Sequence, residues 1–430
     1  MTKSERPVAV DLFAGAGGMS LGFEQAGFDV LAAVEIDPIH CATHEFNFPD
    51  CAILCANITE LSGDDIRRNS SIGDRPVDCV FGGPPCQGFS MIGHRALDDD
   101  RNQLVFHFIR VVLELRPRYF VMENVSGLTV GEHKKFLIEI IAEFRKSGYE
   151  VEAKYQVLNA ANYGVPQSRK RLFLFGCKKG EKLPAYPGPL TLLPQENADL
   201  LGIPKCPRVA DALNDLPCVD NKKILFSQDH IKAKYGKPSN YAASLRDIER
   251  DPDDKSFPRH FDPTILTSSL LTVHTADSIE RFSRTKCGDT EPISRFFKLD
   301  PNGICNTIRA GTPSNRGAFT SPRPIHHTSP RCITVREAAR LHSYPDWFRF
   351  HATKWHGFRQ VGNSVPPLLA RAVAKEIVAV SGLQIAKPKR LVDLGMQSLL
   401  ELNMKEAAGR YGVDPHVIEP RRRQIEEANA

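Results

Sequence analysis

A cysteine stands in an unusual loop, in the segment GGPPCQGFS that runs from Gly82 to Ser90. Two glycines leave space beside it, and two prolines hold the chain before it extended. The loop follows the apolar run VDCVF, so Cys86 is expected on a rigid turn at the end of a buried strand. A cysteine at an arbitrary position is usually an inert buried thiol. This placement instead favours a nucleophile, whose reactive form is the thiolate.

Two further segments carry groups that can act beside a thiolate. Glu123 begins the tripeptide ENV after another apolar run, and the ends of neighbouring strands would bring it close to Cys86. Arg169 and Arg171 in QSRKR point to one side if that segment is extended, and such a pair can hold a phosphate and a base carbonyl. The alternatives are a glutamate that only caps a helix and a solvated basic strand edge.

A third group of residues is suited to a nucleoside. The segment DLFAGAGG, from Asp11 to Gly18, lets the backbone turn tightly and approach a ligand. Glu35 ends the next predicted strand, where a carboxylate can bind both hydroxyls of a ribose. The segment lacks the dinucleotide fingerprint, and no phosphate-binding lysine follows it. The pattern therefore predicts a nucleoside-bearing cofactor without a diphosphate, against the alternative of a merely structural turn.

Short apolar runs that alternate with amphipathic stretches must position these groups. We expect strands over Pro7–Phe13, Val30–Glu35, Val77–Phe81, Tyr119–Met122, Tyr149–Leu158 and Leu172–Phe175. We expect helices after Gly18, over Asn102–Leu115 and Glu132–Lys146, and after Pro367. This alternation predicts an α/β fold around a mixed, mostly parallel sheet, with ligands at the carboxyl ends of the strands.

The composition of the sequence changes between residues 182 and 332, where Pro, Ser, Thr, Asn and Asp become frequent and the apolar residues lose their regular spacing. We expect a small, loop-rich domain here, inserted between two parts of the α/β domain at 1–181 and 333–385. Residues 386–430 form a basic tail. Its segment from Lys405 to Arg423 is faintly like a helix-turn-helix, but a small packing helix with a basic end is favoured.

Composition narrows the class of protein. The chain has 430 residues, a formal net charge of +5 and eleven cysteines without C-x-x-C spacing, which predicts neither a zinc site nor a disulfide framework. The mild positive charge permits a polyanionic partner without requiring one. No apolar run approaches the length of a membrane span, and no signal peptide is read. We therefore expect a cytoplasmic protein without a metal.

Six segments together resemble the signature blocks of the C5-cytosine-specific DNA methyltransferases, in the order of that family. They are DLFAGAGG, GGPPCQGFS, ENV, QSRKR, ITVREAARL from Ile333, and QVGNSVPP from Gln360. The resemblance implies an S-adenosylmethionine-dependent, Rossmann-like methyltransferase fold. It also implies that residues 182–332 are a target-recognition domain and that the rest of the α/β fold is catalytic.

The resemblance implies a mechanism as well. Cys86 would add to C6 of a cytosine flipped out of the duplex, which makes C5 nucleophilic toward the methyl group of S-adenosylmethionine. Glu123 would hold N3 and the exocyclic amine of the base, with a pKa raised by burial. Arg171 would hold the base O2, and Arg169 the nearby phosphate. Proton loss from C5 and elimination of the thiol would complete the reaction.

The cofactor residues implied by the matching motifs are Phe13, Gly15, Gly18, Glu35, Ile36, Asn57, Ile58, Pro84, Leu104, Asn363 and Ser364. One position departs from the family pattern, because Asn57 stands where an aspartate is usual. An asparagine carbonyl can accept the same hydrogen bond from an adenine amine.

Contacts to DNA are expected from residues in two loops: Ser90, His94, Arg95, Arg309 and Arg316. The polar segment from Met91 to Asn102 is placed to close over the substrate as a lid. Arg309 belongs to the segment TIRAG, which resembles a block that many family members carry near the DNA. A solvated loop face is the alternative interpretation of the histidine and the arginine in the lid.

The expected function is therefore sequence-specific DNA (cytosine-5-)-methylation of double-stranded DNA by a monomer, in a restriction-modification role beside a cognate restriction endonuclease. A cytosine-5 methyltransferase of tRNA is the alternative within the same chemistry. A non-catalytic DNA-binding relative is the alternative from another class, but a binding module needs no set of Cys86, Glu123 and Arg171. Zinc-dependent deamination lacks the necessary ligand spacing.

Overall fold

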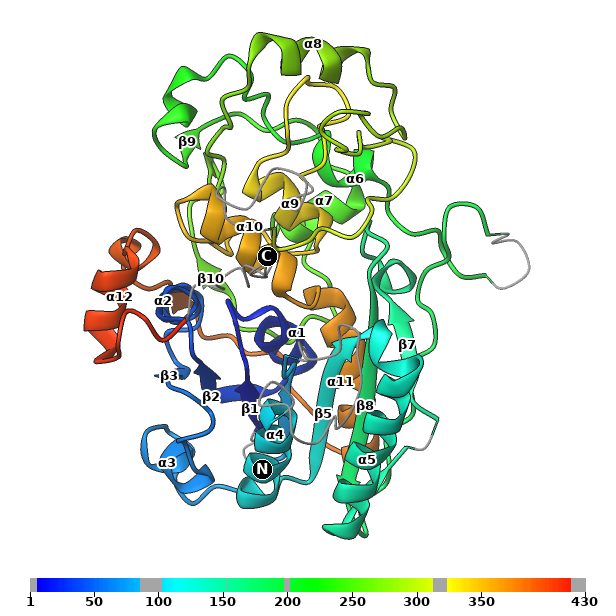
Figure 1. The fold of residues 1–430 in the computed structure, drawn as a ribbon, viewed down its shortest axis with the longest axis vertical. Helices are drawn as coiled ribbons and strands as arrows, with labels where there is room; N and C mark the ends of the chain where they lie inside the picture. Colours follow the sequence, from blue (N-terminus) through cyan, green and yellow to red (C-terminus); the bar gives the residue numbers. More distant parts are fainter. Residues whose placement is uncertain (1–5, 86–102, 153, 197–201, 312–322, 419–430) are drawn as a thin grey trace, which may run out of the picture.

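The computed structural model describes residues 6–85, 103–152, 154–196, 202–311 and 323–418. Its centre is an 8-stranded sheet in the order β3-β2-β1-β4-β5-β8-β6, with β7 also paired to β8 (Figure 1). The strands are β1 (Val8–Leu12), β2 (Asp29–Glu35), β3 (Ala52–Cys55), β4 (Cys79–Gly82), β5 (Tyr119–Val125), β6 (Tyr149–Val151), β7 (Gln156–Asn159) and β8 (Lys170–Lys178).

Strands β1 to β5 pair in parallel, and β8 runs against β5, β6 and β7. The strand order reverses between β1 and β4, and ligands bind beyond the carboxyl ends of the strands at such a point. The predicted α/β class with a mixed, mostly parallel sheet is confirmed.

One expected strand is wrong, because the segment from 149 to 158 forms two strands. Val151 pairs with Gly176 and Gln156 with Phe173, so four residues of this segment stand opposite two of β8. The extra residues interrupt the ladder, as in a bulge. The chain between β2 and β4 also forms elements for which there was no prediction: β3, α2 (Pro38–Asn47) and α3 (Gly63–Arg68).

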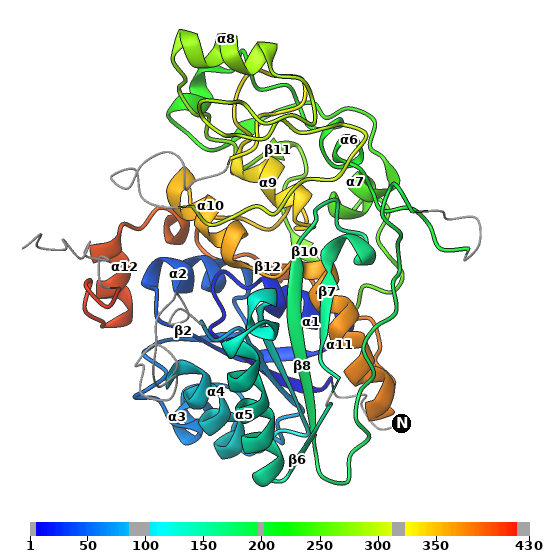
Figure 2. The same cartoon turned by 45° about the vertical axis from the view of Figure 1, so that its right-hand side comes forward.

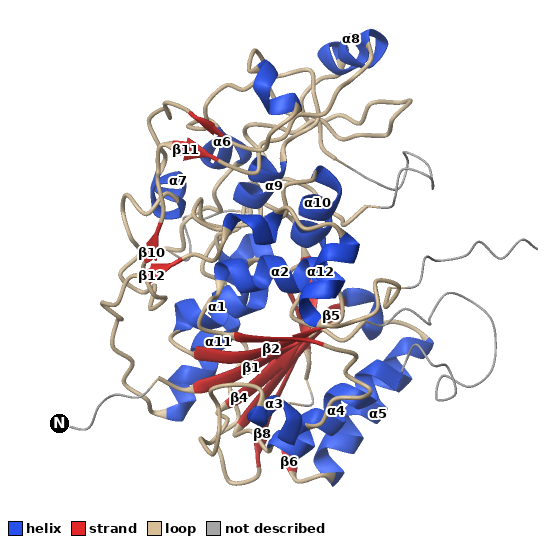
Figure 3. Ribbon diagram, turned by 90° about the vertical axis from the view of Figure 1, so that its left-hand side faces the viewer, coloured by secondary structure: helices blue, strands red, loops and turns tan. Residues whose placement is uncertain are grey.

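Alternate side chains of the strands serve two hydrophobic cores. Val8, Val10 and Leu12 share a core with helices α4 (Gln103–Leu115) and α5 (Glu132–Lys146), whereas Ala9 belongs to the core on the other face. That second core contains α1 (Gly18–Ala26) and α11 (Pro367–Ser381), which pack on each other (Figure 3). The helices expected in these places are therefore present. Short 3-10 turns cover Ser126–Thr129, Ala160–Tyr163 and Lys223–Phe226.

Most elements of the region from 182 to 332 lie beyond the carboxyl edge of the sheet (Figure 2), and the described part of the region consists mostly of loops. Its segment around Lys255 instead reaches the amino edge, where the Lys255 carbonyl accepts a hydrogen bond from Arg6 at 2.8 Å. Its regular elements are short: α6 (Val209–Leu213), α7 (Asn240–Leu245), α8 (Ala276–Arg284), β9 (Ile231–Lys232), β10 (Arg259–His260) and β11 (Ile265–Leu266). We call it the inserted region; its extent as a separate domain stays a prediction.

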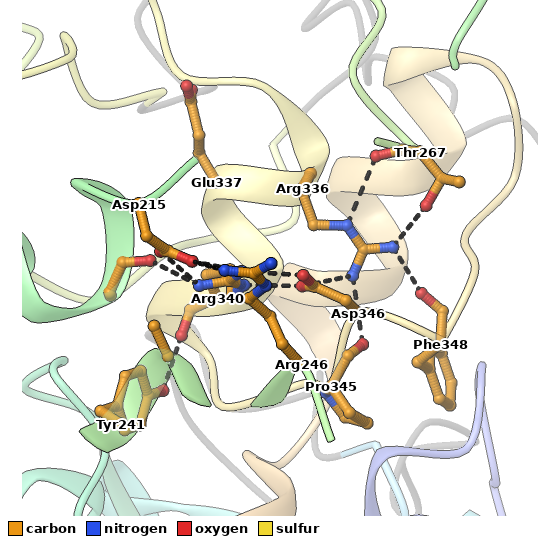
Figure 4. A network of polar contacts seen from close by, with 12 residues as sticks. Asp215, Tyr241, Arg246, Thr267, Arg336, Glu337, Arg340, Pro345, Asp346 and Phe348 are labelled. Carbon is orange, nitrogen blue, oxygen red and sulfur yellow. Dashed lines mark hydrogen bonds and ion pairs between the residues drawn. The ribbon is translucent and has the colours of Figure 1, made fainter. Parts of the chain in front are cut away.

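Helix α9 (Val335–Leu341) ties the inserted region to the rest of the chain (Figure 4). The guanidinium of Arg340 is fully buried and donates to Asp215 at 3.0 Å and to Asp346 at 2.6 and 2.7 Å. Arg336, one turn earlier, donates to the Thr267 hydroxyl at 2.7 Å. This end of the catalytic part therefore shares a buried charge network with the inserted region.

The tail packs against α2 on the side away from α11 (Figures 1 and 3). Its described part contains β12 (Val392–Asp393), which pairs with β10, a 3-10 turn at Gln397–Leu400, and α12 (Met404–Tyr411). One packed helix fits the favoured packing-helix interpretation, and the described residues of the tail contain no second α-helix. Within the described ranges, no helix is long and apolar enough to cross a bilayer.

Candidate active site

A cavity of about 780 Å³ lies at the carboxyl ends of β1, β2, β4 and β5. Every residue expected at the cofactor site lines it: Phe13, Gly15, Gly18, Glu35, Ile36, Asn57, Ile58, Pro84, Leu104, Asn363 and Ser364. Glu123 and Arg171 line the same cavity. The fold thus gathers residues from both ends of the chain around one space, while their contacts to a ligand stay predictions.

The carboxylate of Glu35 braces the glycine-rich turn. Its Oε2 accepts the N–H of Gly15 at 2.8 Å, and its Oε1 accepts the N–H of Asp37 at 2.9 Å. Carboxylate oxygens offer about four acceptor sites in total, so two remain for the hydroxyls of a ribose. Asn57 is similar, since its Oδ1 accepts the N–H of Thr59 at 3.1 Å and can accept a second hydrogen bond.

Glu123 and Arg171 form the polar floor of the cavity. The Arg171 Nε lies 2.8 Å from the Glu123 Oε1, and the two side chains are only 14% and 12% exposed. Burial raises the pKa of Glu123, and the charges of Arg171 and Arg169 offset part of that rise. A Cβ at Gly83 would lie 2.7 Å from the Glu123 Oε2, so a larger residue there would displace the carboxylate from its present position. A glutamate in this state is suited to hold or donate a proton.

Asn124 connects this floor to the loop of the cysteine, a role that the sequence did not indicate. Its Nδ2 donates to the carbonyl of Pro84 at 3.0 Å, so β5 holds the Pro84-Pro85 turn in place. Pro84 and Pro85 both line the cavity. Cys86 follows directly in the chain and lies outside the described residues, together with Ser90, His94, Arg95 and the expected lid.

The role expected for Arg169 is wrong. Its side chain is fully buried, and its guanidinium donates to the carbonyls of Ile308 at 2.8 Å and Gly362 at 2.7 Å. Such a group cannot reach a phosphate on DNA. A Cβ at Gly362 would lie 2.2 Å from the backbone nitrogen of Ala310, so the end of α10 (Lys354–Asn363) touches the TIRAG segment directly. Arg169 is therefore a positioning residue that holds these two segments together.

Gln167, also in QSRKR, joins TIRAG to the end of α9, a role for which there was no prediction. Its Oε1 accepts the N–H of Ile308 at 3.1 Å, and its Nε2 donates to the carbonyl of Leu341 at 3.2 Å. Thr307 adds a hydrogen bond from its hydroxyl to the carbonyl of Ser168 at 2.7 Å. QSRKR and TIRAG are thus hydrogen-bonded to each other although they lie about 140 residues apart in the chain, and the only hint of it in the sequence was that both resemble blocks of the family.

Asp11 is a further cavity residue without an assigned role. It is 1% exposed and accepts a hydrogen bond from the Ser20 hydroxyl at 2.6 Å. Burial raises the pKa of Asp11 to about 8, although the hydrogen bond from Ser20 opposes the rise.

Of the residues expected to contact DNA, Arg309 is exposed at the edge of the inserted region. Arg316 lies outside the described residues.

Comparisons with known proteins agree with this arrangement. The sequence model of the family described as C-5 cytosine-specific DNA methylase matches residues 8–379. The chain is 58% identical to Type II methyltransferase M.XorII of Xanthomonas oryzae pv. oryzae over 98% of its own length and 96% of the relative. It is 35% identical to Type II methyltransferase M1.HphI of Haemophilus parahaemolyticus, over 86% and 87% of the two chains.

A solved structure from E. coli, assigned as a DNA modification methyltransferase encoded within a prophage, superposes with a TM-score of 0.69. It is 34% identical, and the match covers 87% of this chain and 99% of that one. The chain therefore belongs to the C-5 cytosine-specific DNA methylases. It is an enzyme that methylates DNA at carbon 5 of cytosine.

Proposed function

We propose that this enzyme uses S-adenosylmethionine as its methyl donor. Glu35 supplies acceptors for a ribose, and Ile36 and Ile58 supply apolar surface for an adenine. Among the described residues that line the cavity there is no lysine, which fits a nucleoside better than a diphosphate. Phe13, Gly15, Gly18, Pro84, Leu104, Asn363 and Ser364 would hold the remainder of the donor. When bound, S-adenosylmethionine supplies an electrophilic methyl group.

The side chains of the enzyme perform the remaining chemistry. The thiolate of Cys86 adds to C6 of cytosine, which makes C5 nucleophilic. Glu123, held by Arg171, donates a hydrogen bond or a proton at N3 as negative charge develops on the ring. Arg171 extends the same contact to O2. After methyl transfer the C5 proton leaves, the C6–S bond breaks, and the thiol is regenerated.

The single observation that carries this proposal is the position of the Glu123–Arg171 pair. The pair lies on the same cavity as the predicted donor residues, beside the Pro84-Pro85 turn that leads into Cys86. An acid, a cation that holds the base and a nucleophile that adds to C6 are the set that methylation at C5 requires. A module that only binds DNA has no use for a buried pair of this kind in a cavity.

We infer further that the cytosine is flipped into this cavity and that the inserted region reads the surrounding bases. Flipping costs a few kcal/mol, which contacts to the base and backbone must offset. Arg309 is exposed, and its backbone touches Gly362, which lines the cavity, so it is suited to contact the DNA. Ser90, His94, Arg95 and Arg316 are proposed for the same surface.

The biological setting is inferred from the relatives, which are named Type II methyltransferases. We propose that the enzyme acts as a monomer in the cytoplasm and protects its target sites from a cognate restriction endonuclease. No contact between the two enzymes is needed, because the methyl group itself blocks cleavage.

Trapping on DNA that contains 5-fluorocytosine tests the proposal. Fluorine cannot leave as a proton does, so a working enzyme with S-adenosylmethionine should stall as an adduct that survives denaturation. The adduct should disappear in Cys86→Ala, and sequencing of trapped DNA should identify the target site. A matched assay on tRNA is the comparison arm. An adduct on tRNA and none on DNA would overturn the proposed substrate, and no adduct on either would overturn the mechanism.

A further inference from the structure

The tail beyond the segment that matches the family reaches the cavity. Val417 and Ile418 both line it, although the family match ends at residue 379. Both side chains are partly buried. The cavity is otherwise lined by residues of the catalytic part, so this pair is an apolar addition from a segment to which the family motifs assign no role.

The tail is fixed to the catalytic part before it reaches the cavity. Leu399 and Leu400 form a small core with Ala42 and Phe46 of α2. The N–H of Gly395 donates to the carbonyl of Phe46 at 2.8 Å. These contacts hold the chain along α2 (Figure 1).

Helix α12 adds a polar anchor on the same surface. The Tyr411 hydroxyl donates to Glu45 Oε2 at 2.6 Å, and the Arg410 Nη2 donates to Glu45 Oε1 at 2.5 Å. Ala407 and Ala408 are fully buried beneath them. Glu45 belongs to α2, so a single carboxylate fixes the end of the tail helix.

The chain after α12 turns in a defined way toward the cavity. The N–H of His416 donates to Asp414 Oδ1 at 2.7 Å, and the N–H of Val417 donates to the Asp414 carbonyl at 3.1 Å. This turn sets the direction of Val417 and Ile418. A surface segment without a function would not need to present two branched aliphatic side chains to the same cavity as the predicted donor residues.

The position of α2 indicates which part of the cavity is reached. Ile36, Asp37 and His40 line the cavity where the first turn of α2 meets it, directly beyond Glu35. The tail packs on α2 at Ala42 and Phe46, and the first turn of the same helix contributes to the cavity, which favours the nucleoside side for the end of the tail. Adenine is flat and weakly polar, and its burial between aliphatic side chains is favourable.

We propose that the C-terminal segment 413–418 is part of the cofactor site, and that Val417 and Ile418 cover the nucleoside half of S-adenosylmethionine. This inference rests on the proposed donor. Removal of two aliphatic contacts should weaken binding of the unreactive product S-adenosylhomocysteine by roughly tenfold.

Calorimetry with S-adenosylhomocysteine on the full chain tests this. The double variant Val417→Ser with Ile418→Ser should lose about tenfold in affinity. The matched control is Leu391→Ser with Met396→Ser, two aliphatic residues of the same tail that are 55% and 63% exposed and do not line the cavity. Its affinity should equal that of the wild type. Equal affinity in all three proteins, or tighter binding without the aliphatic pair, would overturn the inference.

A proximity measurement separates a direct contact from an indirect one. In Ile418→Cys, alkylation of the new thiol, followed on its own peptide by mass spectrometry, should slow when S-adenosylhomocysteine is added. The thiol of Met396→Cys should react at the same rate with and without it. Absence of protection at position 418 would exclude contact. Failure of the wild type to bind S-adenosylhomocysteine at all would instead overturn the proposed donor, and this inference with it.

Discussion

The cavity floor and the network around α9 both bury ion pairs, but they leave different groups available. Glu123 and Arg171 make one direct contact and retain 12% and 14% exposure on the cavity side. Arg340 has no exposed surface, and its guanidinium is divided between Asp215, Asp346 and the carbonyl of Ala212. The first pair lines a cavity that can admit a ligand, whereas the second does not line that cavity and its arginine is enclosed by protein, with Asp346 only 9% exposed.

This difference separates residues that can take part in the reaction from residues that only hold the fold together. A buried charge without full compensation is costly, so a pair with an open face must be held by the surrounding fold and can use its free lone pairs on a substrate. A saturated network has no capacity left and serves only to join elements. The two arginines of QSRKR differ in a similar way, since Arg171 faces the cavity, whereas both Nη atoms of Arg169 donate to carbonyls and its Nε is buried without a partner.

The largest effect should come from the open pair. Glu123→Gln keeps the shape of the side chain but removes both its charge and its acidity, so methyl transfer should fall by about 10²–10⁴-fold. The unfolding midpoint should stay close to that of the wild type. Single-turnover assays on a target duplex measure the first quantity and thermal unfolding the second. A rate within threefold of the wild type would mean that the open face has no catalytic use.

A substitution in the network around α9 should lower the stability of the protein. Arg340→Met leaves Asp215 and Asp346 buried without their shared partner, and should lower the free energy of unfolding by about 3–5 kcal/mol. Arg284→Met is the matched control, because its pair with Glu280 is 76% and 58% exposed and should contribute less than about 1 kcal/mol. Urea unfolding compares them. Similar losses in both variants would remove the distinction between closed and exposed pairs.

Asp11 offers a test through pH. Its pKa of about 8 in the folded protein lies above the ordinary value of 3.8, so the folded state retains a proton that the unfolded chain releases. The stabilisation is therefore complete below about pH 4 and declines as the pH rises toward 8, by at most about 1.4 kcal/mol per pH unit. Asp11→Asn should flatten this decline between pH 5 and 7 in urea titrations. Parallel curves for the two proteins would refute the assignment.

The smallest effect is expected from the exposed arginine of the inserted region. Arg309→Ala should weaken DNA binding by about fivefold and reduce its salt dependence, with unchanged stability. Arg169→Met should lower the stability and leave the salt dependence of DNA binding unchanged, because its guanidinium donates to two carbonyls rather than to DNA. Fluorescence anisotropy at several salt concentrations measures DNA binding by the two variants, and thermal unfolding measures their stability. If Arg169→Met lowered the salt dependence of DNA binding, the original prediction that Arg169 contacts a phosphate would be supported, against the argument from its burial.

Much of the fold was accessible from the sequence because strand and helix periodicity is local. The apolar runs that end at Glu35, Phe81 and Met122 matched real strands, and α5 was predicted with its exact bounds. The interruption between β6 and β7 was not accessible, since it depends on register against β8. There was no prediction for α2 or α3; α3 has only 6 residues, and α2, with 10, is buried on almost every side and so lacks a clear polar face.

The sequence by itself determined the class of enzyme, the residues around the cavity and the glutamate at its floor. Motifs that follow strands carry this information, because parallel strands deliver their carboxyl ends to one edge whatever lies between them. Gly83 beside the cavity then leaves room for the carboxylate of Glu123.

Only the tertiary structure decided what depends on partners distant in the chain. Burial of Arg169 required Ile308 and Gly362, the role of Asn124 required Pro84, and the reach of the tail required its anchor on Glu45. No local pattern encodes such contacts, because a side chain's availability is set by what packs over it. Arg169 and Arg171, two residues apart, therefore look equivalent in the sequence but differ in burial and in partners in the folded enzyme.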